Sequence, residues 1–567
     1  MNHRSEPSLW NLPANPLFRR YAAARLRIVR LIVWVILSQV ITGFLWALAV
    51  LIYLISMNPA QISFELGTPA FDSLLEEHGQ IAFLIGWMMV LIVQGVIVIM
   101  KGTFSVATGV ARESNEGMMD GIHLTPLSTS RKIVGQLLGL PILENLIAIQ
   151  LLPWVGLSAV LGGLPLEMIG KVYLLFASSA LFHHAIGLVA GTIIRQKILA
   201  GTLAQLCVIL LHFVLPTFGK FGIGVISHLG VEPAIYHTIV RAVPSVTKPE
   251  FFQSNEELSS TVSFFRWEFL IPGYHWVITI SALAILVVIL ARRWNDRRSL
   301  LLGKVGVAVS VCWILTLTCG ELLPKFEGGN IPVEFAGRVP GEVGQMWVLG
   351  FGMMLGILNL VFVSLLVPSR EARIRVENER WWGDGRDALP WVLGISLMSI
   401  VAWCLLIRAM NSGDFGSMPL EFTDVFVLSC SIMIPAVSWY AFVLWQGWKR
   451  ALCIGFIVGV LPLMISILGA LVSASPDGWP KWFGGASLLV MPGYAAAWRM
   501  PSMTNLHFGS VFLTSALCYT VATVFISRSA RLLAQPRRFL TPFAECPPLE
   551  DGVPDRMHTN TNEHTKK

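Results

Sequence analysis

The sequence predicts an all-α polytopic integral membrane protein with about twelve transmembrane helices, arranged as two tandem six-helix halves. Of its 567 residues 54% are apolar and only 13% are charged, whereas a soluble chain carries about 25% charged residues. Too little polar surface remains to cover a water-soluble core of this size. Apolar runs such as Leu31 to Ile55 are long enough to cross ~30 Å of hydrocarbon at ~1.5 Å per residue.

Residues 1–28 form the first element, a cytoplasmic basic segment. In "LFRRYAAARLRIVR", Arg19, Arg20, Arg27 and Arg30 lie among apolar residues at near-helical spacing. Such a segment is either a basic amphipathic helix in the lipid headgroup layer or a simple positive flank of the first span. The polar residues before that span, and its length, favour a retained anchor over a cleavable signal peptide.

Apolar windows place six spans in residues 29–300, the first half, and six in residues 301–535, the second half. The first six are 29–56, 80–107, 134–162, 172–193, 198–218 and 272–291. The second six are 303–323, 345–367, 389–408, 422–446, 451–474 and 506–527. Residues 536–567 are polar and rich in proline, which predicts a disordered cytoplasmic tail.

The distribution of Lys and Arg orients these spans. Most of the 41 basic residues fall in or beside the segments that are cytoplasmic when the N-terminus is inside, and the loop 57–79 contains none. The positive-inside rule therefore predicts that both termini are cytoplasmic, in a bacterial-type cytoplasmic (inner) membrane. The net charge of +7 then belongs to the inner membrane surface and requires no nucleic-acid partner.

In the two halves, long and short loops follow one another in a similar order. Each carries a long outer segment before its last span, and each of those regions contains Pro-Gly-Tyr, at Pro272–Tyr274 and at Pro492–Tyr494. This pattern predicts a 6 + 6 duplication with parallel repeats, an arrangement known among transporters. The alternative is twelve spans of unrelated origin.

The cytoplasmic hairpin 112–133 is longer than a connection between spans needs to be. Val110 to Leu124 is expected to form one helix, along which Glu113, Glu116 and Asp120 share a face. Pro126 disfavours helix at the preceding residue and so ends this one, and Ser128 or Thr129 caps the next. The hairpin is therefore predicted to expose residues to a soluble partner.

This hairpin resembles the cytoplasmic signature of the ATP-binding-cassette type-2 export permeases. The shared pattern is E-x-x-x-G-x-x-[DE]-x-x-x-x-T-P-L-S, followed by I-x-x-G-x-L. Its matching positions are Glu113, Gly117, Asp120, Thr125, Pro126, Leu127, Ser128, Ile133, Gly135 and Leu137. Met118, Gly121, His123 and Gln136 depart from it, the last in place of a usual Lys. With the six-span unit and the basic N-terminal segment, the resemblance covers about residues 17–300.

The resemblance implies a permease subunit of an ABC exporter, which moves an unidentified substrate and is not itself an enzyme. Its implied partners are cytoplasmic ABC ATPase subunits, membrane lipids and a second permease in a homo- or heterodimer. No G-x-x-x-x-G-K-[ST] phosphate loop occurs, so this chain binds no cofactor, and ATP and Mg²⁺ belong to the partner ATPase. The loop 369–387 lacks Thr-Pro-Leu-Ser and is either a diverged second docking element or a charged surface loop.

Polar residues inside apolar spans are the candidates for a translocation pathway. They are Glu144, His183 and His184, although Glu144 could instead pair with a neighbour. Adjacent residues on a helix diverge by about 100°, so the His-His pair does not predict a metal site. The eight cysteines show no paired spacing and predict neither disulfides nor zinc.

Three other classes of function stay open at this point. A membrane-embedded transferase would use acidic residues near the membrane, as in the loop 57–79, and would turn over without an ATPase. An ion-coupled carrier would require Glu144 or the histidines. A membrane scaffold protein would bind partners without moving a substrate.

Overall fold

The computed structural model describes residues 12–57, 69–214, 224–243, 261–295, 300–327, 340–367, 388–412 and 422–446, with short pieces near 216 and 520. Eight of the described helices are long and apolar enough to cross a membrane, which confirms a helical membrane protein. The expected span 451–474 and most of 506–527 lie outside the described residues. The number twelve and the 6 + 6 duplication therefore stay predictions.

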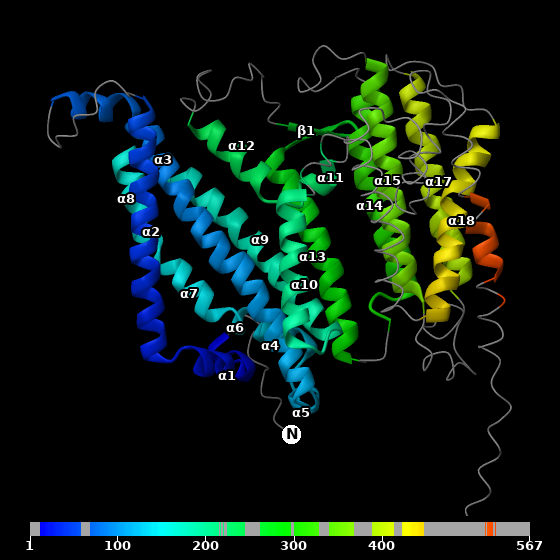
Figure 1. Ribbon diagram of the computed structural model, residues 1–567, viewed down its shortest axis with the longest axis horizontal. Helices are drawn as coiled ribbons and strands as arrows, with labels where there is room; N and C mark the ends of the chain where they lie inside the picture. The colour runs from blue at the N-terminus through cyan, green and yellow to red at the C-terminus, as the bar shows by residue number, and fades with distance from the viewer. Residues whose placement is uncertain are drawn as a thin grey trace, which may run out of the picture.

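The N-terminal segment contains a short 3-10 helix, η1 (Leu12–Ala14), and then α1 (Pro16–Arg25). The Asn15 side chain caps α1 by accepting from the backbone N–H of Leu17 at 3.0 Å, and proline suits the first helical position. α1 lies across the foot of the bundle, and α2 (Ile28–Met57) rises beside it (Figure 1). The basic segment is thus a helix of its own, and its contact with a membrane stays a prediction.

The second span is one long rod made of α3 (Pro69–Gly95), the π-helix η3 (Val96–Gly102) and α4 (Thr103–Asn115). The expected single helix from Val110 to Leu124 is wrong. Gly117 adopts the left-handed conformation with φ of 72°, which ends α4, and α5 (Met118–Leu124) starts after it. Glu113 and Asp120 therefore lie on different helices.

The third span is also broken, in place of the single helix expected over 134–162. It consists of α6 (Thr129–Gly139), α7 (Ile142–Gln150) and α8 (Leu152–Gly162). Pro141 and Pro153 lie at the two breaks and cannot donate backbone hydrogen bonds. Side chains from neighbouring helices bond to carbonyls beside the second break: Gln94 donates to Ala148 O at 2.9 Å, and Gln39 donates to Gln150 O. Such substitutes are what buried irregular backbone requires in a membrane.

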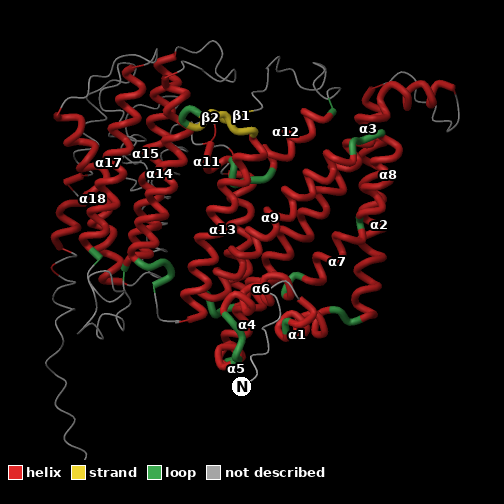
Figure 2. The backbone as a smooth tube through the Cα atoms, turned by 180° about the vertical axis from the view of Figure 1, so that it is seen from behind, coloured by secondary structure: helices red, strands yellow, loops and turns green. Residues whose placement is uncertain are grey.

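The remaining helices of the first half are α9 (Leu166–Ile193), α10 (Lys197–Ile209) with the π-helix η4 (Leu210–Val214), and α13 (Ile271–Asn295). Between η4 and α13 lie α11 (Gly224–Ser227), α12 (Glu232–Ala242) and the antiparallel strands β1 (Thr261–Phe264) and β2 (Trp267–Leu270). The β1–β2 hairpin is the departure from an all-helical fold among the described residues. It lies at the end of the molecule opposite α1 and α5 (Figure 2).

The described helices of the second half are α14 (Lys304–Glu327), α15 (Pro340–Leu366), α17 (Leu389–Ser412) and α18 (Phe422–Gln446). They stand together beside the first half (Figure 1) around an apolar core that includes Trp347, Phe351 and Trp403. β1 and α11 contact α14. The Phe264 ring lies so close to Gly320 that an added Cβ there would meet it at 2.3 Å.

Candidate functional site

α5 is a short two-faced helix at the tip of the hairpin, at the same end of the molecule as α1 (Figure 1). Met119 and Ile122 face inward and are only 4% and 3% exposed. Asp120 and Gly121 face outward, and Leu124 is 87% exposed. Leu124 therefore lies on the outer face of the hairpin, where it is accessible to another molecule.

Contacts from α6 and α13 hold α5 in place. The His123 ring lies 4.8 Å from the Trp294 ring, and Lys132 Nζ donates to the His123 carbonyl at 3.1 Å. Thr129 Oγ1 donates to Asn295 Oδ1 at 2.9 Å, which joins the start of α6 to the end of α13. α5 is therefore attached to two transmembrane segments besides the one that leads into it.

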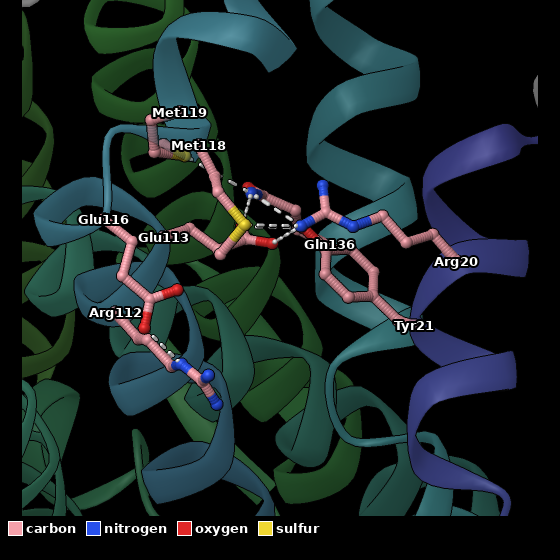
Figure 3. Close-up of polar contacts among 8 residues, drawn as sticks. All are labelled: Arg20, Tyr21, Arg112, Glu113, Glu116, Met118, Met119 and Gln136. Atoms are coloured by element: carbon pink, nitrogen blue, oxygen red, sulfur yellow. Dashed lines mark hydrogen bonds and ion pairs between the residues drawn. The ribbon is translucent and has the colours of Figure 1, made fainter. Parts of the chain in front are cut away.

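Glu113 is the centre of a buried hydrogen-bond network next to α5, whose side chains are drawn in Figure 3. Its carboxylate accepts from Tyr21 Oη at 2.8 Å and from Gln136 Nε2 at 3.2 Å. These three side chains come from α4, α1 and α6 and are almost completely buried. Gln136 also lies 3.8 Å from Met119 Sδ, on α5. One carboxylate thus joins three helices directly and α5 through Gln136.

Charge compensation for Glu113 comes from Arg20, whose guanidinium lies 3.4 Å from the carboxylate and also donates to Met118 Sδ at 3.1 Å. Burial raises the pKa of the Tyr21 phenol, and the nearby negative charge of Glu113 adds to the effect. Tyr21 therefore stays protonated and acts as a donor. Glu116 is different, because it pairs with Arg112 at 2.7 Å on an exposed surface.

Three side chains of α1 reach three different helices, and we call Asn15, Tyr21 and Arg25 the α1 clasp. Asn15 Nδ2 donates to the Arg131 carbonyl of α6 at 2.9 Å, Tyr21 bonds Glu113 of α4, and Arg25 pairs with Glu144 of α7 at 3.3 Å. Two glycines of α6 let α1 approach closely. An added Cβ would lie 2.9 Å from Asn15 Oδ1 at Gly135 and 2.8 Å from the Tyr21 ring at Gly139.

Glu144 is the α7 partner of this clasp. It is 2% exposed, accepts from Ser105 Oγ at 2.7 Å and forms the ion pair with Arg25. Burial lowers the pKa of Arg25, and the Glu144 carboxylate opposes that change. The alternative that Glu144 pairs with a neighbour is therefore what the geometry shows, and its role in a pathway stays a prediction.

His183 and His184 lie apart from Glu144's network and face different neighbours. His183 Nδ1 is 2.6 Å from the Ser179 carbonyl, and its ring stacks on that of His212 at 4.8 Å. His212 in turn contacts the Glu232 carboxylate at the edge of α12. His184 Nε2 is 3.0 Å from the carbonyl of Val98 in η3. Among the described residues no group of three ligands could hold a metal ion.

The predicted coupling residues occupy contrasting positions. Glu116, Gly117, Asp120, Pro126 and Ser128 are exposed, Thr125 and Leu127 are half-buried, and Glu113 is buried. Thr125 closes α5 by donating to the Ile122 carbonyl at 2.6 Å. Ser128 occupies the N-cap position of α6, although its hydroxyl contacts Ser130 and caps no backbone N–H.

Sequence reasoning missed Asn15, Tyr21, Arg25 and Gln136 as members of this site. Only Gln136 carried a signal, because it departs from the resembled pattern. Comparison with known proteins adds no assignment, since no family model, curated protein or solved structure matches the chain.

Proposed function

We propose that this protein is the membrane permease subunit of an ABC exporter and that a separate cytoplasmic ATPase docks on α5. The observation that carries the proposal is the construction of α5, which has an outward face of Asp120, Gly121 and Leu124 and an inward face fixed to the bundle. A helix that only connected two spans would not need both features.

The contacts of α5 suit the transmission of force. A displacement of α5 would act on α6 through Lys132, on α13 through Trp294, and on α1 through Met118 and Arg20. Buried networks with fixed geometry move as units because any one partner left unsatisfied is costly. In this mechanism the ATPase moves the hairpin, and the attached helices convert that motion into alternating access.

The rest of the assembly follows from the same proposal. ATP and Mg²⁺ are bound by the ATPase, which faces the cytoplasmic side of the inner membrane together with α1 and α5. Lipids surround α2, whose apolar side chains include Val40 and Phe44, at 65% and 66% exposed. The loop 369–387, which lies outside the described residues, would bind a second ATPase copy in a single-chain permease. Otherwise a second permease would supply that contact.

Photocrosslinking tests this docking directly. The protein is co-expressed with the products of its neighbouring genes, with a photoreactive phenylalanine analogue at Leu124, which is 87% exposed, or at half-buried Leu127. The expected result is a crosslink to the ATPase from position 124 and little from 127, together with a stoichiometric complex on purification. The proposal fails if no ATPase associates and Gly117→Val leaves substrate flux unchanged.

A further inference from the structure

A small cavity lies inside the second half, between α15 and α18. Its volume is about 10 Å³, which by this measure is about the space of one water molecule. Gly356 and Asn359 line it from α15, and Ser431, Pro435 and Ala436 line it from α18. No carboxylate or basic group is among the lining residues.

Asn359 supplies an unpaired amide to this cavity. The residue is 5% exposed, and neither its Nδ2 nor its Oδ1 makes a hydrogen bond within the described part of the protein. A buried amide without partners is costly, and most such groups in native proteins bond to protein or to ordered water. The position therefore calls for a partner that accepts from Nδ2 and donates to Oδ1.

Pro435 removes one backbone donor on the opposite side of the cavity. Proline has no N–H, so it cannot donate to the carbonyl of Ser431 one helical turn earlier. The Ser431 hydroxyl cannot substitute as a donor, because it donates to the Leu428 carbonyl at 2.7 Å. On the α18 side the cavity therefore meets acceptors, such as the Ser431 carbonyl. On the α15 side it meets the Asn359 amide, with Nδ2 as donor and Oδ1 as acceptor.

We propose that Asn359 and the proline break of α18 form a binding site for one water molecule, which accepts from Asn359 Nδ2 and donates to Asn359 Oδ1 and to the carbonyl of Ser431. Water suits the site because it both donates and accepts. A sodium ion suits it poorly, because the ion would leave the Asn359 amide N–H groups unpaired and would find no carboxylate among the lining residues. The bound water would take the place of the hydrogen bond that Pro435 removes, so that α18 can bend at this point without exposing bare backbone to the apolar core.

A double-mutant cycle of Asn359→Leu and Pro435→Ala tests the water by thermal unfolding of the full chain in detergent. In the native background N359L should lower the unfolding midpoint, because it displaces the water and strands the Ser431 carbonyl. In the P435A background the new backbone N–H serves that carbonyl, so N359L should cost less. Equal shifts in both backgrounds, or a rise in both, would show a dry site and overturn the proposal. P324A, which removes a proline of α14 that does not line the cavity, is the matched control and should leave the effect of N359L unchanged.

Two further measurements test the water directly in the native protein, where packing defects of the N359L variant play no part. A cryo-EM map at water-resolving resolution should show density within hydrogen-bond distance of both Asn359 and Ser431, and N359L should lack it. Replacing sodium chloride by choline chloride should leave the unfolding midpoint of the native protein unchanged. A native map without that density contradicts the proposal. If the unfolding midpoint falls only when sodium is removed, the site binds a cation and the water proposal is wrong.

Discussion

The foot of the first half and the described core of the second half are held together by different chemistry. At the foot, Tyr21, Arg25 and Asn15 join α1 to three other helices through hydrogen bonds and an ion pair. In the second half the helices pack mainly through aromatic and aliphatic side chains, with a few hydrogen bonds between helices, such as Trp439 to Ser364. The described ion pair there, Lys325 with Glu321, lies within α14. Buried polar networks specify one arrangement more strictly than apolar packing does. These polar contacts thus fasten the helices of the first half to one another at the end where we propose that the ATPase docks.

Breaking the α1 clasp at Arg25 should give the largest effect. Arg25→Met leaves the Glu144 carboxylate buried without its cation, which should lower the free energy of unfolding by about 3 kcal/mol. Arg27→Met is the control, because Arg27 is exposed, and it should change stability by less than about 0.5 kcal/mol. The midpoint of thermal unfolding in detergent measures both. Equal midpoints for the two variants would mean that α1 is not structurally fastened to α7.

Glu113 and Glu116 allow a sharper comparison within one hairpin. Glu113→Ala removes the acceptor of Tyr21 and Gln136 and should cost about 2 kcal/mol. Glu116→Ala removes an exposed pair and should cost about 0.5 kcal/mol or less. Thermal unfolding separates the two variants, and ATPase stimulation in the complex shows whether Glu113 acts through structure. If E116A lowers ATPase stimulation more than E113A does, direct contact of the hairpin surface with the ATPase contributes more to coupling than the buried Glu113 network does.

The sequence predicted the apolar helices well and the polar connections between them poorly. Long apolar windows and the end of α5 before Pro126 follow from local rules, which a single sequence contains. The split at Gly117 was missed because a glycine in mid-pattern can be helical or left-handed, and only packing decides. The α1 partners of Glu113 and Glu144 lie 92 and 119 residues away, and no local pattern indicates such distant pairing. The contrast between exposed Glu116 and buried Glu113 was invisible for the same reason.

Two glycines of the α5 region test whether the shape of the hairpin matters. At Gly117, with φ of 72°, an alanine must adopt the left-handed conformation, which costs about 1 kcal/mol or more. At Gly121 an added Cβ meets no atom within 4 Å, so alanine should be neutral or stabilise the helix by up to about 1 kcal/mol. We expect G117A, and not G121A, to reduce ATPase stimulation and substrate flux. The opposite order would show that the α5 surface, and not its geometry, limits coupling.

The smallest effect on ATPase binding should come from the second half, at Trp439. Its indole donates to Ser364 Oγ at 2.7 Å and to the Leu360 carbonyl at 3.1 Å, which ties α18 to α15. Trp439→Phe keeps an aromatic ring and removes the donor, so stability should fall by about 1 kcal/mol. ATPase binding should not change, because the residue lies in the apolar core, away from the foot of the first half. If W439F weakened ATPase binding as much as G117A does, the two halves would be equally coupled to the docking surface. The contrast between polar contacts at the foot of the first half and apolar packing in the second half would then have no functional meaning.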